Sequence, residues 1–355
     1  MARTAWLAPA GALYAHLARR RRERYAASPG LQRRLERPVV SIGNLAIGGT
    51  GKTPVVAHLA AALVDAGERP AVLTRGYGRR VVEDGVVVAR TPERLTADVD
   101  RSGDEPAMLA RRLDGAAVVV CADRHLAGRY AEARLGCTVH LLDDGFQHVR
   151  LARDLDLVLV TEDDLTAGAV LPSGRLREGL DALTRADALI VPDVPLARAE
   201  QLAAHVGVPC AFASRRRLGV ARRVDDAEKS VEKECAVLAC AAVARPERFF
   251  EDLRADGWHV VGDLRWRDHH RFTAADVAAV DRARRAAGAS LVITTEKDVV
   301  RWLSWRPLPF PLAWVPLMLD VEPADALVPW VVERIRTIRS ASGAAEHGAS
   351  SPGCW

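Results

Sequence analysis

The chain has 355 residues, enough for one large domain or two ordinary ones, and its 49% hydrophobic and 27% charged residues are typical of a soluble globular protein. The net charge of +4 is too small to indicate nucleic-acid binding, and the six cysteines include no C-x-x-C pair, so we expect neither a zinc site nor a disulfide framework. No stretch approaches the roughly 20 apolar residues that span a bilayer, and the chain does not start like a secretory signal, so we expect a cytoplasmic protein.

The first segment, residues 1–37, combines an apolar helical stripe with a basic end. The stripe consists of Trp6, Ala10, Leu13, Tyr14 and Leu17, and arginines follow at positions 19, 20, 21, 22 and 24. Such a helix can lie on an anionic membrane surface with its arginines at the headgroups. It can equally pack on the protein's own core with a solvated basic end.

A glycine-rich turn follows, between a predicted strand at residues 39–42 and a predicted buried helix at residues 55–64. Converging backbone N–H groups and the positive end of the helix can hold phosphate there, while Lys52 offsets charge and Thr53 reaches Mg²⁺. The general phosphate-loop pattern has glycine where this chain has Ala46. The candidate nucleotide-binding residues are Gly48, Gly49, Thr50, Gly51, Lys52 and Thr53.

Strand and helix patterns then alternate along the chain, which predicts a mainly parallel sheet covered on both faces, with ligands at the carboxyl ends of the strands. We expect an α/β protein with a P-loop NTPase-type mainly parallel sheet domain and a second, smaller α/β domain. The expected boundaries are 1–37 for the N-terminal amphipathic basic helix, 38–210 for the nucleotide-binding domain, 211–233 for a connection, 234–322 for the smaller domain, 323–339 for a C-terminal helix and 340–355 for a disordered tail.

Two pairs of carboxylates are candidates for chemistry. Asp143 and Asp144 end a predicted strand, and although Asp-Asp-Gly is by itself more often a turn, either carboxylate can hold Mg²⁺ beside a phosphate loop. Asp104 and Glu105 open a predicted helix, which they can simply cap. Alternatively, Asp104 is a general base that accepts a hydroxyl proton during phosphoryl transfer.

Several further polar residues lie near predicted strand ends. Arg75 and Arg177 are suited to clamping phosphate or substrate, although surface arginines are common in this chain. In Asp268-His269-His270, adjacent histidines point differently and make a poor metal site, so we expect one histidine to reach across a cleft to a carboxylate. Residues 295–298 superficially match the guanine-reading motif of GTPases, but the order is wrong, which argues against a guanine-specific switch.

Taken together, these motifs resemble the tetraacyldisaccharide 4′-kinase family, the lipid A kinases of Gram-negative bacteria. The resemblance covers roughly residues 6–335, and the family's loop likewise departs from the general pattern at the position of Ala46. Gly179 departs from the family, which usually has proline there, in the loop that the resemblance implies faces the sugar. The motifs are GNLAIGGTGKTP (43–54), TRGYGR (74–79), GDEPAMLARR (103–112), ADRHLA (122–127), LLDDGFQHVRLARDLD (141–156), LPSGRLRE (171–178), ARPERFF (244–250), DHHRF (268–272) and TTEKD (294–298).

The resemblance implies transfer of the ATP γ-phosphate to the 4′-hydroxyl of a tetraacylated glucosamine disaccharide 1-phosphate, with Asp104 as the catalytic base and His269 as its partner. It implies ATP and Mg²⁺ as cofactors, a nucleotide site at the hinge of two domains, and an N-terminal helix that touches the inner membrane. The expected partners are therefore the lipid A disaccharide precursor and the anionic cytoplasmic face of that membrane, with no nucleic acid and no obligate protein partner.

Two other classes of protein share some of these features. A P-loop regulatory or metallochaperone-type ATPase would pass phosphate to water and dimerise with nucleotide. A nucleotide-sensing membrane adaptor would use the basic helix but leave the carboxylate and histidine motifs without a role.

Overall fold

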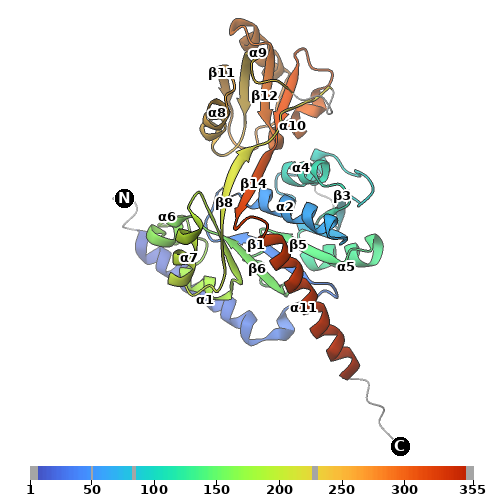
Figure 1. Cartoon of the computed structure of the whole chain (residues 1–355), viewed down its shortest axis with the longest axis vertical. Helices are drawn as coiled ribbons and strands as arrows, with labels where there is room; N and C mark the ends of the chain where they lie inside the picture. Colours follow the sequence, from blue (N-terminus) through green and yellow to red (C-terminus); the bar gives the residue numbers. More distant parts are fainter. Residues whose placement is uncertain (1–6, 49–50, 82–84, 226–230, 349–355) are drawn as a thin grey trace, which may run out of the picture.

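The computed structural model describes residues 7–48, 51–81, 85–225 and 231–348, which form a larger and a smaller domain joined by a narrow waist (Figure 1). The larger domain holds a nine-stranded sheet in the order β14-β8-β7-β6-β1-β5-β2-β4-β3. The smaller domain holds a five-stranded sheet in the order β11-β10-β12-β13-β9. All neighbouring strands run parallel except β3 with β4, β8 with β14 and β9 with β13. The predicted α/β fold with a mainly parallel sheet is therefore confirmed.

The central strands of the large sheet are short apolar runs because helices cover both faces. The alternation along one strand shows the two layers: Leu157 packs in the cluster of α2 and α11, whereas Val158 packs in the cluster of α7. The strands of this sheet are β1 (Val39–Asn44), β2 (Pro70–Thr74), β3 (Val87–Arg90), β4 (Ala117–Val120), β5 (Val139–Asp143), β6 (Leu155–Leu159), β7 (Ala188–Pro192), β8 (Ala211–Leu218) and β14 (Leu317–Glu322).

The helices of the larger domain lie on opposite faces of this sheet. Helices α2, α4 and α11 contribute to one apolar layer, and α5 and α7 contribute to the layers on the other side. The helices are α1 (Ala8–Ala27), α2 (Lys52–Asp65), α3 (Val99–Ser102), α4 (Asp104–Arg112), α5 (Arg124–Leu135), α6 (Glu162–Ala167), α7 (Leu196–His205) and α11 (Leu327–Gly348), with short 3-10 turns η2 (Pro29–Leu31) and η3 (Leu180–Arg185).

The smaller domain is a second α/β layer structure. Its sheet buries Phe250 of α8 on one face, and on the other the Trp302 ring of α10 stacks on Phe272 with ring centroids 3.7 Å apart. Its elements are β9 (Arg222–Arg223), β10 (Val237–Ala241), α8 (Pro246–Ala255), β11 (Val260–Arg265), α9 (Ala274–Ala286), β12 (Leu291–Thr295), α10 (Glu296–Trp302), η4 (Leu303–Trp305) and β13 (Leu312–Val315).

The connection between the domains differs from the expected one. Residues 211–218, expected to be part of a linker, form β8, and residues 317–322, expected to belong to the smaller domain, form β14. These strands pair antiparallel from Ala213 to Leu218, so the chain enters and leaves the smaller domain through a two-stranded ribbon (Figure 1). The part of the ribbon nearer the smaller domain is more exposed, which explains why β8 carries the basic composition of a linker: Arg215 and Arg217 are both solvent-exposed.

The end of the chain also differs. Residues 340–348, expected to be part of a disordered tail, continue helix α11, and the rest of that tail lies outside the described residues. Arg339 anchors the helix just before this extension. Its guanidinium pairs with Glu68 at 2.6 Å and donates to the carbonyl oxygen of Thr138, which ties this part of α11 to the larger domain.

Helix α1 buries Gly11 and Arg22 against the larger domain rather than its apolar stripe. Gly11 packs against Ser173, and the buried Arg22 donates from Nη1 to Oε2 of Glu178 at 2.8 Å. Leu13 and Leu17 of the stripe are 60% and 57% exposed. Among the described helices, none has the length and apolar character needed to cross a bilayer.

Gly43 of β1 allows the loop after β5 to approach the strand closely. A Cβ atom at position 43 would lie 2.7 Å from the backbone nitrogen of Phe146. We expect Gly43→Ala to lower the free energy of unfolding by about 1–3 kcal/mol, because the buried backbone must shift to accommodate the methyl group. Urea unfolding measures this change. The matched control is Gly30→Ala, where a Cβ meets nothing within 4 Å, and equal stabilities of the two variants would contradict the argument.

Candidate active site

The phosphate loop lies where β1 ends and α2 begins. Gly48 and Gly51 have φ angles of +107° and +90°, a backbone region that strains other residues, and α2 starts at Lys52 directly afterwards. Gly49 and Thr50 lie outside the described residues. The predicted order of strand, loop and helix is therefore present, and the amino end of a 14-residue helix points at the loop.

The segment that carries the LPSGRLRE motif supports this loop from the side. The backbone N–H of Ile47 donates to the carbonyl oxygen of Arg175 at 2.8 Å, and that of Arg177 donates to the carbonyl oxygen of Leu45 at 2.6 Å. Ala46, where the general pattern has glycine, is buried and bridges to Leu176. Ala46 and Leu176 also belong to the same apolar cluster.

Lys52 and Arg177 meet on one carboxylate, that of Asp144. The Lys52 ammonium lies 3.4 Å from Oδ1, and Arg177 Nη1 donates to Oδ2 at 2.9 Å. Burial raises the pKa of Asp144, but the charges of Lys52 and Arg177 outweigh it and hold the pKa below its ordinary value. Asp144 is therefore a fixed anion beside the phosphate loop.

Asp143, the neighbouring residue, lies in a different environment. Its carboxyl is 5% exposed at the end of β5, and burial together with the nearby charge of Glu105 raises its pKa to about 7. Asp144 takes a positive φ of 57°, which turns the chain sharply between the two side chains. The pKa values of two adjacent carboxyl groups are thus shifted in opposite directions by their surroundings.

Asp104 and His269 come together from different domains. Asp104 is the first residue of α4 in the larger domain, and His269 lies in the loop after β11 of the smaller one. The His269 ring nitrogen Nδ1 is 3.0 Å from Oδ2 of Asp104, and the carboxylate is 6% exposed. The sequence expectation that a histidine reaches a carboxylate across a cleft thus has a matching contact in the structure.

The Asp104 carboxylate is held ionised by its partners. Burial is the largest influence and raises its pKa, but the hydrogen bond with His269 and the positive charge of Arg301 together bring the pKa below its ordinary value. An ionised carboxylate near neutral pH is able to accept a proton.

Sequence reasoning missed two cations that surround this pair, Lys297 and Arg301. Lys297 Nζ is 3.3 Å from Oε1 of Glu105 and 3.3 Å from Nε2 of His269. Arg301 Nε is 3.4 Å from Oδ2 of Asp104. Their four-residue spacing places both on one face of α10, and this periodicity is the signal that the sequence offers. The TTEKD motif contains Lys297, but it assigns a role to neither residue.

Arg75 lies at the rim of the site. It is exposed just after β2. The pKa of Arg124 is lowered to about 10, mainly by burial, and the positive charge of Arg75 contributes to this decrease. Next to it, the Tyr77 ring meets the His269 ring edge-on with centroids 5.6 Å apart.

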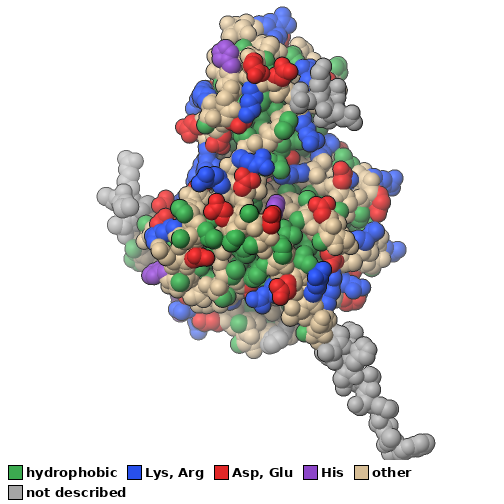
Figure 2. Space-filling view, viewed as in Figure 1, with side chains coloured by type: hydrophobic (Ala, Val, Ile, Leu, Met, Phe, Trp, Pro, Cys, Tyr) green, Lys and Arg blue, Asp and Glu red, His purple; other side chains and the backbone are tan. Residues whose placement is uncertain are grey.

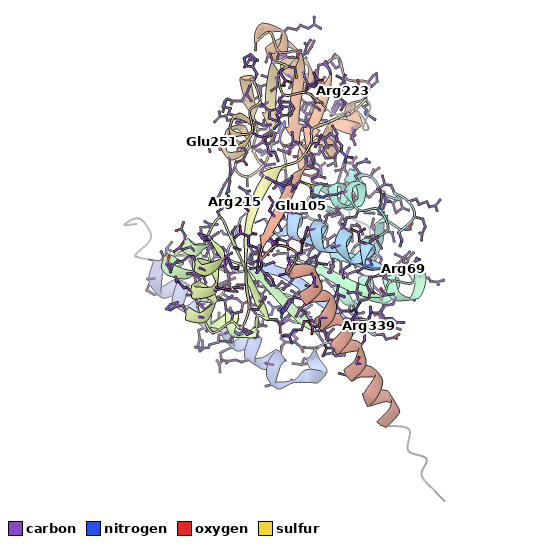
Figure 3. The ribbon with its side chains drawn as sticks, in the orientation of Figure 1. Arg69, Glu105, Arg215, Arg223, Glu251 and Arg339 are labelled. Carbon is purple, nitrogen blue, oxygen red and sulfur yellow. The ribbon has the colours of Figure 1, made fainter. Side chains whose placement is uncertain are left out.

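The phosphate loop and the Asp104–His269 pair belong to one connected region at the waist. The charge of Glu105 acts on Asp143 at one end, and Glu105 pairs with Lys297 at the other. Figure 3 shows Glu105 where the larger domain faces the smaller one, and Figure 2 shows Lys and Arg side chains gathered around this waist. Such a concentration of cations suits a polyanionic ligand.

Comparison with known proteins identifies the family. The family model described as tetraacyldisaccharide-1-P 4′-kinase matches residues 3–336. The chain belongs to this family. The tetraacyldisaccharide 4′-kinase of Koribacter versatilis is 39% identical over 310 residues, covering 86% of this chain and 91% of its own, and that of Geobacter sulfurreducens is 39% identical over 304 residues, covering 83% of each.

A solved structure agrees with this assignment. LpxK from Aquifex aeolicus, solved in complex with ATP, matches 94% of this chain and 99% of its own chain with a TM-score of 0.75 and 29% identity. The family and the kinase class predicted from the motifs are therefore confirmed, and the regulatory or metallochaperone ATPase is not favoured.

The residues of this kinase fit a magnesium ion. Thr53 offers a hydroxyl, and Asp143 and Asp144 offer carboxylates, which are the oxygen ligands that Mg²⁺ prefers. The described residues contain no group of three or more His, Cys, Asp or Glu that could hold a metal. An ion here would therefore take its remaining ligands from phosphate and water, as is usual for Mg²⁺ in phosphate-loop enzymes.

Lys52 generates a prediction about nucleotide affinity. We expect Lys52→Ala to weaken ATP binding by roughly ten- to a hundredfold, because a charged hydrogen bond to phosphate is lost. Isothermal titration calorimetry with magnesium and ATP measures the effect. Lys233→Ala is the matched control, since Lys233 pairs with Asp256 on the surface of the smaller domain. Equal affinities in the two variants would remove Lys52 from the nucleotide site.

Proposed function

We propose that this chain binds ATP at the phosphate loop and transfers its γ-phosphate to the 4′-hydroxyl of a tetraacylated glucosamine disaccharide 1-phosphate. The observation that carries the proposal is the connected region at the waist. A helix amino end with Lys52 lies at one side, and the buried, ionised Asp104 lies at the other. These are the two requirements of phosphoryl transfer to an alcohol, a phosphate cradle and a proton acceptor.

On the nucleotide side, the loop from Gly48 to Thr53 holds the phosphates and Lys52 offsets their charge. Thr53, with Asp143 or Asp144, holds Mg²⁺, which when bound neutralises charge on the phosphate oxygens. Asp144 is already shared by Lys52 and Arg177, which fixes both cations near the loop. We therefore assign Arg177 to positioning charge at the phosphates, and the exposed Arg75 to contact with substrate at the rim.

On the acceptor side, Asp104 takes the proton of the 4′-hydroxyl. An alcohol has a pKa far above neutral, so its attack needs a carboxylate that accepts the proton as the new bond forms. His269 orients Asp104 through the 3.0 Å contact between Nδ1 and Oδ2. Because the transferred phosphoryl group forms no covalent bond with the protein, the rate depends on placing hydroxyl, phosphate and carboxylate together.

Replacement of the base tests this assignment. We expect Asp104→Asn to lower kcat by about 10²- to 10⁴-fold, because an amide cannot accept the proton. Radiolabelled ATP incubated with and without the acylated disaccharide measures transfer to the lipid. The control is Asp65→Asn at the exposed end of α2. An Asp104→Asn protein that labels the lipid at the wild-type rate refutes the assignment of the base.

We further propose that α1 places the enzyme on the cytoplasmic face of the inner membrane as a peripheral protein. Its docking residues, Gly11 and Arg22, are buried, whereas Leu13 and Leu17 are exposed and Tyr14 is 42% exposed. An exposed apolar stripe beside a basic helix end matches the chemistry of an anionic bilayer surface. The acylated substrate lies in such a surface, so the helix would bring the site to it.

This membrane contact is tested without removing α1. We expect the double variant Leu13→Ser/Leu17→Ser to bind vesicles containing phosphatidylglycerol about tenfold or more weakly, since two apolar side chains no longer enter the bilayer. Cosedimentation measures binding. Leu126→Ser on α5, 46% exposed, is the control for loss of a surface leucine. Unchanged binding of the α1 variant would exclude this stripe as the membrane contact.

A further inference from the structure

Two cationic or hydrogen-bonding groups approach the Asp104 carboxylate, and both come from the smaller domain. His269 reaches Oδ2 at 3.0 Å, and Arg301 Nε lies 3.4 Å from the same oxygen. His269 precedes α9 and Arg301 lies in α10, so two separate elements converge on one atom of the larger domain. The described residues form no hydrogen bond to Oδ1, which leaves that oxygen to receive a proton.

Arg301 is immobilised within the smaller domain. Its Nη1 donates to the carbonyl oxygen of His270 at 2.7 Å, and its Nη2 donates to the carbonyl oxygen of Ala242 at 3.2 Å and pairs with Asp298. Its guanidinium lies over the Phe272 ring, 5.6 Å from the centroid. The residue is 7% exposed. The terminal nitrogens are thus occupied, and the orientation of the remaining N–H is fixed.

That remaining group, the buried Nε–H, has no hydrogen-bond partner among the described residues. Buried N–H groups without partners are rare in folded proteins, and this one lies 3.4 Å from a carboxylate oxygen, a distance that can shorten to a hydrogen bond when the site closes. We propose that Arg301 is the positioning residue of the general base: with His269 it fixes Asp104 Oδ2, so that Asp104 is a competent base only while the smaller domain is docked.

The surroundings of Asp104 support this role. The other charges near it are Lys297 on α10, Glu105 on its own helix and Asp268 beside His269, and Lys297 pairs with both of these carboxylates. Asp298 is compensated by Arg301 itself. Arg301 therefore acts on Asp104 as a fixed cation, and its charge lowers the pKa of that carboxyl. The inference rests on the proposed function, because it assumes that Asp104 accepts the hydroxyl proton.

The sign of the effect follows from the charge. Removing Arg301 raises the pKa of Asp104, so the ionised form, and with it activity, is lost at a higher pH when the solution is acidified. In the pH dependence of kcat/KM we expect the acid limb to move upward by about one pH unit, the lower end of what an opposite charge at this distance produces. At pH values below the limb, kcat/KM should fall about tenfold relative to wild type, and above the limb the decrease should be small. The KM for ATP should be unchanged.

Arg301→Gln alone would leave the buried Asp298 without its cation, which can unfold the domain. The variant to measure is therefore Asp298→Asn/Arg301→Gln, in which both charges disappear together. Because loss of the Asp298 anion opposes the effect of losing Arg301, we expect its acid limb to move upward by less than about one pH unit. Arg301→Lys retains the charge and should keep the acid limb within a few tenths of a pH unit of wild type. Thermal unfolding of each variant verifies that the smaller domain is folded.

Arg248→Gln is the matched control. Arg248 of α8 pairs with Asp193 of the larger domain at 2.8 Å, so the control also removes an arginine contact between the domains without touching Asp104. We expect its acid limb to coincide with that of wild type. If the folded Asp298→Asn/Arg301→Gln protein loses activity equally at every pH, or if Arg248→Gln shifts the limb as much, Arg301 does not position the base. Failure of the proposed function is distinct: the wild type would then put no label into the lipid, or Asp104→Asn would retain full activity.

Discussion

The contact between Asp104 and His269 joins residues of two domains, and it exists only while α10 lies against α4. Arg112 of α4 fixes this arrangement. Its Nη1 donates to Oε2 of Glu296 at 3.0 Å and to the carbonyl oxygen of Leu317 at 2.9 Å. One guanidinium therefore binds the first residue of α10 and the first residue of β14. Burial raises the pKa of Glu296 and the charge of Arg112 opposes that rise, so the pair is strongest when Glu296 is ionised.

The ribbon of β8 and β14 also determines how the smaller domain is held over Asp104. Antiparallel pairing joins the two connecting strands by backbone hydrogen bonds, so the smaller domain is attached by a strip of sheet rather than by two loops. An apolar layer also continues from α2 and α4 through Trp302 into the smaller domain. Movement of the smaller domain must then bend this ribbon and slide α10 on α4. Such movement would withdraw His269 and Arg301 from Asp104 together, which makes the base sensitive to domain position.

The sequence predicted those parts of the site that depend on local rules. Positive φ at Gly51, a strand before it and a helix after it are signals that neighbouring residues carry, so the phosphate loop could be located. Asp143 and Asp144 could be found because they end a strand of a parallel sheet. Their opposite pKa shifts could not, since these depend on Glu105, Lys52 and Arg177 from other parts of the chain.

The parts that the sequence did not reveal depend on long-range pairing. The basic second half of β8, Arg215 to Arg217, is a strand because β14, about a hundred positions later in the numbering, pairs with it. In the sequence, Arg301 cannot be distinguished from any other arginine of a helix. Its role depends on Asp298 and two backbone carbonyl oxygens, which orient its side chain in the fold. For helix α1, the sequence predicts an apolar stripe that packs either on the protein's own core or on a membrane surface. Its docking through Arg22 could not be read from periodicity, because the partner Glu178 is 156 residues away.

That docking of α1 also connects the proposed membrane surface to the chemistry. Arg22 binds Glu178, and the adjacent Arg177 binds Asp144 beside Lys52. The same segment holds the phosphate loop through backbone hydrogen bonds to Leu45 and Ile47. Both side chains of the Arg22–Glu178 pair are buried, so water screens the pair little and it resists displacement. A bilayer that accepts the exposed stripe of α1 would therefore set the height and orientation of the phosphate loop through one rigid segment, and an acceptor hydroxyl on a lipid headgroup would meet the loop at a fixed distance from the membrane plane.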